Sequence, residues 1–153
     1  LSAAMAEEIL LRLAMPGAER KKAVQLIRWH DAPVRQERAH LAFWLRTLPK
    51  EQFFRLLAVK RADNLAQNRE VSDRSAELDR LEAAARDFLA GNPPLSPKDL
   101  TVTGRDLMPL GFSGPELGAA LRRLTAGAAR GDFPNEKAAL LQAARRMKRR
   151  QLD

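Results

Sequence analysis

Apolar residues recur at three- and four-residue spacing along almost the whole chain, and this periodicity limits the fold more than any other feature. The pattern is clearest between about Arg35 and Leu48, where Leu41, Trp44 and Leu45 join Leu48 on one face. A helix that contains Met5, Ile9 and Leu13 is predicted from the start of the chain to Pro16-Gly17, and further helices are predicted over about residues 18–29, 49–65 and 72–90. No alternating strand pattern is longer than Leu100–Val102. We therefore predict an all-α fold.

Each predicted helix has an apolar face that we expect to be buried. The expected residues are Met5, Ile9 and Leu13 on the first helix, Phe54, Leu57, Ala58, Ala62 and Leu65 on the fourth, and Leu78, Leu81, Ala85 and Phe88 on the fifth. Burial of these faces would hold the helices together.

The best candidate for a domain boundary is Gly91–Pro94, where a helix stop signal precedes two prolines. Beyond it, three segments have the capping-box spacing, in which a Ser or Thr precedes an acidic residue by three positions. These segments are Ser96–Asp99, Thr103–Asp106 and Ser113–Glu116, and Asn135 is expected to cap a last helix. We predict a helical bundle over residues 1–92, followed by a smaller helical domain over residues 93–153.

The composition excludes several classes of protein. The chain of 153 residues has no cysteine, which rules out disulfides, thiolate metal sites and cysteine nucleophiles, and it has only two histidines, His30 and His40. It lacks an apolar run of about 18 residues and a signal-peptide pattern, so we expect a cytoplasmic protein with no membrane partner. Because Leu1 lies inside a predicted helix, we also expect a piece of a longer protein.

Positive charge is the first functional clue. The formal net charge is +8, and most basic residues are arginines, whose planar guanidinium suits phosphate. Residues 93–153 carry 11 basic and 6 acidic residues, whereas the first 92 carry 16 and 13, so the shorter part holds most of the net charge. Nucleic acid is the favoured partner, although membrane surfaces and acidic proteins also attract basic patches.

Nucleotidyl or phosphoryl transfer needs carboxylates that hold magnesium against the phosphates, and a D-x-D motif on a strand would supply them. The nearest case, Glu77-Leu78-Asp79, lies on a predicted helix, where residues two apart do not share a face. A phosphate-binding G-x-x-x-x-G-K-[ST] loop is missing as well. We therefore expect no catalytic residue in this chain.

Two polar motifs leave alternatives open. The dipeptide His30-Asp31 could belong to a divalent-metal phosphohydrolase site, or it could end a helix, where a histidine opposes the macrodipole. Farther along, Arg61–Asn68 is a polar ladder, with Asp63, Gln67 and Asn68 among its members, on a helix whose other face is apolar. These side chains would either tie neighbouring helices together or face a ligand.

Two basic features are candidates for phosphate contacts. At Gly104-Arg105, a glycine and an arginine accompany the backbone N–H groups of a helix start, although Asp106 could cap that helix itself. The cluster Arg145–Arg150 could follow a phosphate backbone, or it could be a solvated helix end, where positive charge offsets the dipole.

One stretch of the sequence is distinctive. Leu100–Phe112, which contains Thr103-Gly104-Arg105-Asp106-Leu107, is followed by Gly114–Gly118 and, farther on, by Gly131–Glu136. This pattern resembles the C-terminal region of bacterial CCA-adding enzymes, which are tRNA nucleotidyltransferases of the poly(A) polymerase family. The upstream segments Glu7–Leu10, Ile27–Asp31 and Lys60–Asn68 resemble the middle helical region of that family, so the resemblance covers essentially the whole chain. Members of the family often have Lys where Arg105 stands.

The resemblance implies a division of labour. In that family an N-terminal head carries the catalytic carboxylates and uses CTP, ATP and Mg²⁺, while helical regions hold the acceptor stem and elbow of tRNA. The head would precede Leu1, residues 1–92 would be an HD-related neck and body, and residues 93–153 would be the tail. Asp63 would stand where the last acidic ligand of an HD domain lies, and the other ligands of that metal site would precede Leu1.

Our hypothesis is that the chain binds tRNA and holds no cofactor or metal of its own. The expected RNA-binding residues are Lys98, Gly104, Arg105, Arg122, Arg123, Arg145, Arg146 and Arg149. Two other hypotheses stay open. A remnant of an HD-type metal-dependent phosphohydrolase would bind a divalent metal, and a helical dimerisation module would form a homodimer.

Overall fold

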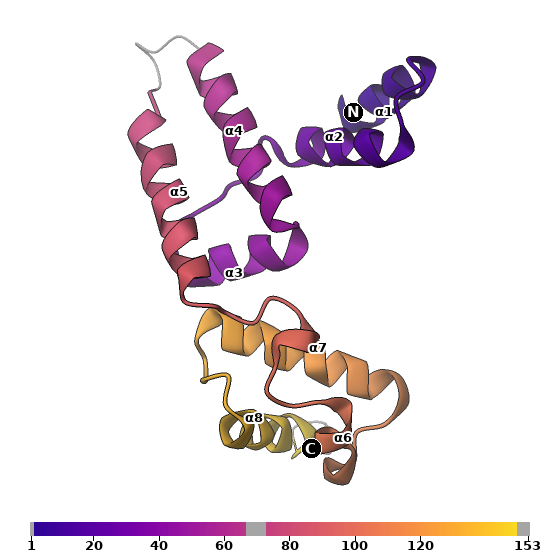
Figure 1. The fold of residues 1–153 in the computed structure, drawn as a ribbon, viewed down its shortest axis with the longest axis vertical. Coiled ribbons are helices and arrows are strands. Elements are labelled where there is room, and N and C mark those ends of the chain that lie inside the picture. Colours follow the sequence, from indigo (N-terminus) through magenta and orange to yellow (C-terminus); the bar gives the residue numbers. More distant parts are fainter. Residues whose placement is uncertain (1, 67–72, 150–153) are drawn as a thin grey trace. The chain divides into compact units, whose positions relative to one another are not determined.

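The computed structural model describes residues 2–66 and 73–149. Within these residues the secondary structure consists of eight α-helices and two short 3-10 helices without any strand, which confirms the predicted all-α fold (Figure 1). The elements are α1 (Ser2–Arg12), α2 (Gly17–Trp29), α3 (Arg38–Thr47), α4 (Lys50–Ala66), α5 (Ser75–Ala90), η1 (Pro97–Asp99), α6 (Gly104–Leu107), η2 (Met108–Leu110), α7 (Gly114–Arg130) and α8 (Lys137–Arg149).

The chain divides into two compact units. The N-terminal unit comprises residues 1–35 and 48–84, and the C-terminal unit comprises residues 36–47 and 85–153. Helix α3 thus belongs to the C-terminal unit, and α5 contributes residues to both units. Compact units are not the same as independently folding domains, so the boundary predicted after residue 92 stays a prediction.

In the N-terminal unit, α1 and α2 pack side by side, and α2 also contacts α4 (Figure 1). The expectation that Met5, Ile9 and Leu13 are buried is wrong, because all three are exposed, Leu13 at 71%. Helix α1 contains no buried residue at all. Its contact with α2 therefore leaves this apolar stripe facing outward.

The predicted face of α4 is correct at Leu57, which is 2% exposed, but wrong at three other residues. Ala58 and Ala62 are exposed, as is Leu65 at 48%, whereas Phe53 and Leu56 are completely buried. The reason is that polar side chains share the inner face of this helix. Gln52 and Asn64 are only 4% exposed, and apolar periodicity alone places such residues outside.

The apolar faces of α3 and α5 are predicted correctly. The α3 residues, with Leu48 just after the helix, are at most 4% exposed, and those of α5 are at most 7% exposed. They are Leu41, Trp44, Leu45 and Leu48 for the first face, and Leu78, Leu81, Ala85 and Phe88 for the second.

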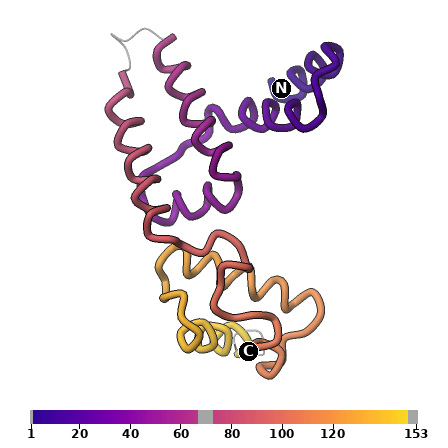
Figure 2. Tube along the Cα trace, in the orientation of Figure 1, coloured from indigo at the N-terminus to yellow at the C-terminus, as the bar shows by residue number. Residues whose placement is uncertain are grey.

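The C-terminal unit has its own hydrophobic core. It draws residues from α6, α7, α8 and the irregular chain before them, whose path Figure 2 follows. Its members are Leu100, Val102, Leu107, Phe112, Ala120, Leu124, Ala128, Leu140 and Ala144. Leu100 and Val102 point inward although the stretch forms no strand, so alternation there indicates burial of an extended loop.

Two of the predicted capping boxes are present. The Asp99 carboxylate accepts the backbone N–H of Ser96 at 2.7 Å, and the Asp106 carboxylate accepts that of Thr103 at 2.8 Å. Ser113 lies at the N-cap of α7 but makes no such side-chain bond.

The expected cap at Asn135 is wrong. Its side chain joins two backbone groups of the loop 99–101, accepting the N–H of Thr101 at 3.1 Å and donating to the carbonyl of Asp99 at 2.8 Å. The carbonyl of Glu136, one residue later, accepts the first hydrogen bond of α8, from Leu140. Asn135 therefore fixes the loop before the helix.

Candidate functional site

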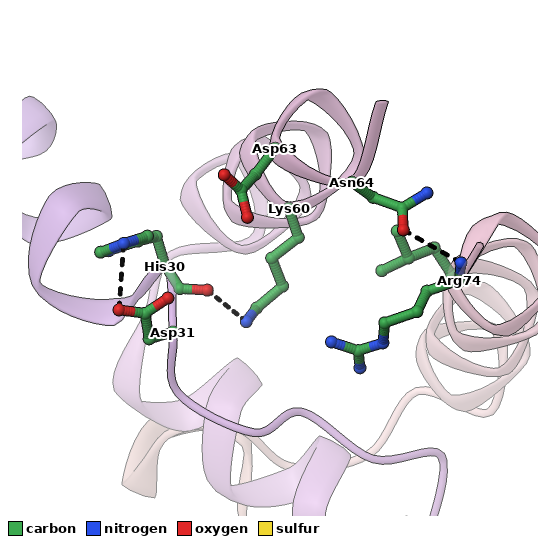
Figure 3. Close-up of a pocket in the computed structure, with 7 residues that line it drawn as sticks. His30, Asp31, Lys60, Asp63, Asn64 and Arg74 are labelled. Carbon is green, nitrogen blue, oxygen red and sulfur yellow. Dashed lines mark hydrogen bonds and ion pairs between the residues drawn. The ribbon is translucent and has the colours of Figure 1, made fainter. Parts of the chain in front are cut away.

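A polar pocket of about 140 Å³ lies in the N-terminal unit (Figure 3). It is lined by His30 and Asp31 after α2, by Lys60, Asp63 and Asn64 on α4, and by Arg74 and Leu78 at the start of α5. The structure thus brings together two motifs that lie far apart in the sequence, the His30-Asp31 dipeptide and the start of the polar ladder.

Lys60 supports the end of α2. Its Nζ donates to the carbonyl oxygen of His30 at 2.5 Å and to that of Ala32 at 2.7 Å. Burial of the amine lowers the pKa of Lys60, and the nearby positive charge of Arg74 lowers it further. Lys60 therefore satisfies two carbonyl groups that have no partner within the helix.

His30 and Asp31 form a local pair at the end of the helix. Nε2 of His30 lies 3.1 Å from a carboxylate oxygen of Asp31, and Nδ1 lies 2.6 Å from the carbonyl oxygen of Ile27. His30 is the C-cap residue of α2. In residues 2–66 and 73–149, no three His, Asp or Glu side chains are grouped so that they could hold a metal ion.

The opposite wall of the pocket joins α4 to α5. The Asn64 side chain accepts the backbone N–H of Arg74 at 3.0 Å and donates to the hydroxyl of Ser75 at 3.3 Å. The guanidinium of Arg74 donates two hydrogen bonds to the Glu77 carboxylate, at 2.8 and 2.9 Å. This pairing lowers the pKa of the Glu77 carboxyl. Asp63 also has an interaction partner.

This pocket is consistent with the helix-tying interpretation of the polar ladder, at least for Asn64, whose bonds join the two helices. Gln67 and Asn68, the other members of the ladder, lie outside the described residues. The two cations of the pocket, Lys60 and Arg74, already bond to oxygens of the protein. Neither is therefore available to bind a ligand without breaking these bonds.

The cationic residues predicted to bind RNA have a different environment. All seven are exposed, and among the described residues none of them forms an ion pair. We call this set the C-terminal cations: Lys98, Arg105, Arg122, Arg123, Arg145, Arg146 and Arg149. Arg150, from the predicted cluster, lies outside the described residues.

Other basic residues of the same unit are neutralised. Arg130 pairs with Asp132 at 2.6 Å, and Lys137 pairs with Asp106 at 2.6 Å. Lys148, although it lies inside the predicted arginine cluster, donates to Glu116 at 2.7 Å and sits 5.0 Å from the centre of the Phe112 ring. The C-terminal cations are thus not simply the basic residues that this unit contains.

Gly104 is placed for packing. A Cβ atom there would lie 3.0 Å from the Leu117 side chain, so glycine lets α6 approach α7 closely. The start of α6 already holds an anion, because the Asp106 carboxylate accepts both the N–H and the hydroxyl of Thr103. Together with Lys137, these donors hold the pKa of Asp106 far below its ordinary value. An RNA contact at Gly104 stays a prediction.

The arginines on α7 and α8 follow the helical repeat. Arg149 follows Arg145 by four residues and Arg146 by three, so the three arginines share one exposed side of α8. Arg122 and Arg123 are adjacent and exposed on α7, and Arg122 lies opposite the buried residues Ala120 and Leu124 in the helical repeat.

Sequence reasoning missed Arg46. This residue lies on α3, between the buried Leu45 and Leu48, and its guanidinium donates to the carbonyl of Arg122 on α7 at 3.4 Å. The available signal was an arginine four residues after Ala42, on the edge of an apolar face.

No helix in the described part of the chain is both long and apolar enough to span a bilayer. No curated protein and no solved structure gives a significant match to this chain. The sequence model of one family does match, and it does so over residues 1–144, which include the polar pocket and most of the C-terminal cations. The chain therefore belongs to the tRNA nucleotidyltransferase domain 2 family.

Proposed function

We propose that this chain is the tRNA-binding helical portion of a tRNA nucleotidyltransferase. The family to which the chain belongs supports a role with tRNA. In that role the chain would bind the tRNA. The chemistry with CTP, ATP and Mg²⁺ is assigned to a separate catalytic head, as in the CCA-adding enzymes that the sequence resembles. The chain by itself transfers no nucleotide.

The observation that carries this proposal is the environment of the C-terminal cations. Seven exposed side chains have no acidic partner among the described residues, whereas three other cations of the same unit are paired. An arginine that is not paired within the protein can form two parallel hydrogen bonds to a phosphate. A phosphate backbone would therefore be recognised through these residues without reorganising the fold.

Recognition would depend on shape and backbone more than on base sequence. Double-helical RNA hides its base edges in a deep, narrow groove, so side chains reach the phosphates and the 2′-hydroxyls. Each phosphate that is neutralised releases condensed counterions, which makes the affinity depend steeply on salt. The chain would thus hold the double-helical arms of tRNA while its 3′ end stays accessible to the head.

The test is a titration of the 153-residue chain with unmodified tRNA at several salt concentrations, followed by fluorescence anisotropy. We expect the logarithm of the association constant to fall linearly with the logarithm of the salt concentration, with a slope of about −4 to −6 for five to seven contacts. Single-stranded RNA of the same length is the control, and it should bind more weakly. Weak binding that does not respond to salt would overturn the proposal.

Two companion measurements separate the other hypotheses. A phosphohydrolase remnant would contain a divalent metal by elemental analysis and would cleave a phosphodiester. A dimerisation module would be a stable dimer in light scattering, and neutralising Arg145, Arg146 and Arg149 would leave tRNA binding unchanged. Either result, together with a failed salt titration, would replace the proposed function.

A further inference from the structure

The lysines and the arginines of α8 have different environments. Lys137, the first residue of the helix, pairs with Asp106 at 2.6 Å. Near the other end of the helix, Nζ of Lys148 donates to both carboxylate oxygens of Glu116, at 2.7 and 2.8 Å. The three arginines of α8 are exposed and form no ion pair among the described residues. The lysines are therefore used within the protein, whereas the arginines are open to solvent.

Lys148 is held by several contacts. Its side chain and that of Glu116 are both half-buried. Its Nζ also lies 5.0 Å from the centre of the buried Phe112 ring, which is a cation–π distance, and its Cε would lie 3.4 Å from a Cβ atom on Gly111. An ion pair that is partly shielded from water and has two charge-assisted hydrogen bonds fixes a side chain better than an exposed pair does.

The last turn of α8 has little burial of its own. The last buried residue of the helix is Ala144, and within residues 145–149 Met147 and Lys148 are half-buried while the arginines are exposed. These arginines repel one another, because like charges three or four residues apart destabilise a helix. The carbonyl groups of the turn also lack partners within the helix, as at every helix end. The turn is therefore prone to fray, and the contact of Lys148 with Glu116 opposes this.

We propose that Lys148 and Glu116 are positioning residues for RNA binding. Glu116 belongs to the first turn of α7, so the ion pair fixes the last turn of α8 against the start of α7 and presents Arg145, Arg146 and Arg149 to phosphates in one arrangement. Side chains on an ordered turn lose less conformational entropy on binding. This inference rests on the proposed function and deepens it, because it separates the cations that bind RNA from the cation that orders them.

The test compares Glu116→Ala with Asp132→Ala in the full 153-residue chain by fluorescence anisotropy. Each substitution removes one paired carboxylate and raises the net charge by one, but the partner of Asp132 is Arg130 on α7. If charge alone matters, both variants bind tRNA slightly more tightly. For Glu116→Ala we expect the opposite, a loss of about threefold to tenfold and a salt slope smaller by about one in magnitude, although no cation is removed. Asp132→Ala should bind at least as tightly as the wild type.

A second set of variants changes the lysine side of the pair. Lys148→Met and Lys137→Met each remove one paired lysine from the same helix, so they change the net charge equally. Lys148→Met should weaken tRNA binding about threefold more than Lys137→Met does, because Lys137 lies at the end of α8 remote from the arginines. Lys148→Arg keeps the charge and can pair with Glu116, so its affinity should stay within about twofold of the wild type.

Amide hydrogen exchange of the free protein tests the positioning without RNA. In Glu116→Ala, the amides of residues 145–149 should exchange faster, whereas those of residues 140–144 should keep the wild-type rate. Faster exchange along the entire helix would indicate a loss of overall stability and would overturn the positioning role. Unchanged exchange at residues 145–149 would overturn it as well.

The outcomes separate this inference from the proposed function. If the wild type binds tRNA with a steep salt slope and Glu116→Ala binds equally or more tightly, the positioning role is overturned and the tRNA-binding role stands. Tighter binding would in addition mean that the freed Lys148 contacts RNA directly. If the wild type does not bind tRNA, both are overturned. If Glu116→Ala does not fold, Lys148→Met is compared with Lys148→Arg, and equal affinities of these two variants overturn the positioning role.

Discussion

The polar pocket of the N-terminal unit contains two cations, Lys60 and Arg74, and each of them bonds to oxygens of the protein itself. The C-terminal cations on α7 and α8 are just as strongly charged, but they face solvent, and the described residues give them no ion pair. The pocket has a volume of about 140 Å³. Its charges, however, are already used to join α2, α4 and α5.

This difference teaches that charges bonded within the protein are accounted for by stability, whereas exposed charges without an ion pair are available to a ligand. Arg28, Arg55 and Arg80 of the N-terminal unit are also exposed, so the choice of the C-terminal cations rests in addition on the higher net charge of residues 93–153. A pocket whose charged groups bond to one another behaves as a polar core, since a ligand would have to displace those bonds. Exposed arginines without partners lose little when a phosphate arrives. We therefore assign stability to the pocket and propose RNA binding for the C-terminal cations.

The largest expected effect comes from α8. Replacing Arg145, Arg146 and Arg149 together by Gln should weaken tRNA binding by about 100-fold at low salt and reduce the magnitude of the salt slope by about three. The reason is that three potential phosphate contacts disappear from one side of the helix. Fluorescence anisotropy at several salt concentrations measures both quantities.

The matched control removes three cations from the N-terminal unit. Lys22, Arg61 and Arg74 are each paired with a carboxylate, and Lys22→Gln, Arg61→Gln and Arg74→Gln change the net charge by the same amount. We expect less than about a threefold loss of affinity, because paired charges contribute mainly to the long-range field. Equal losses for both triple variants would mean that net charge alone drives binding.

The next effect concerns the stability of the pocket. Lys60→Met leaves the carbonyls of His30 and Ala32 without their donor, so it should lower the free energy of unfolding by about 1–3 kcal/mol. Urea unfolding followed by circular dichroism measures this change. The affinity of the folded variant for tRNA should stay within about twofold of the wild type, because the assigned contacts lie in the other unit. A large loss of affinity at full stability would make the pocket part of the binding site.

A smaller effect is expected at Asp106 in acid. Lys137 and Thr103 lower the pKa of this carboxyl in the folded state, so it contributes stability above its ordinary pKa of 3.8 and loses that contribution as the pH falls below 3.8. The wild type should therefore exceed Asp106→Asn in free energy of unfolding at pH 7, and the gap should narrow towards pH 2. A gap that does not change with pH would show that ionisation of Asp106 contributes nothing.

The smallest effect is at high pH. Because the pKa of Lys60 is lowered in the folded state, the folded chain releases this proton before the unfolded chain does. In the interval below pH 10.5 the unfolded state binds more protons, so the contribution of Lys60 to stability rises with pH. The difference in unfolding free energy between wild type and Lys60→Met should widen slightly from pH 8 to pH 10. Narrowing of the difference would contradict the direction of the shift.

Most of the fold follows from the sequence. The buried faces of α3 and α5 and two capping boxes are correctly predicted, because apolar spacing and local side-chain bonds determine them. Only Leu57 of the predicted α4 face is correct, because Gln52 and Asn64 share the inner side of this helix and are buried through hydrogen bonds to distant backbone groups. Hydrogen bonds between residues far apart in the sequence cannot be predicted from apolar periodicity. The bonds of the Asn135 side chain to Thr101 and Asp99 are of this kind.

The candidate site could be predicted only in part. The sequence identifies exposed arginines on amphipathic helices, because their apolar neighbours define the opposite face. It does not distinguish Lys148, which pairs with Glu116 across two helices, from Arg149, which has no such pair among the described residues. It also does not reveal that Arg46 on α3 contacts α7, because the two residues that this hydrogen bond joins are 76 positions apart.

The most direct test of this account is arginine modification by phenylglyoxal with and without tRNA, read by mass spectrometry. We expect tRNA to protect the arginines of α7 and α8, namely Arg122, Arg123, Arg145, Arg146 and Arg149. The exposed arginines Arg28, Arg55 and Arg80 of the N-terminal unit should react equally in both samples. Protection of this second group, while the α7 and α8 arginines stay reactive, would contradict the assignment of RNA binding to the C-terminal cations.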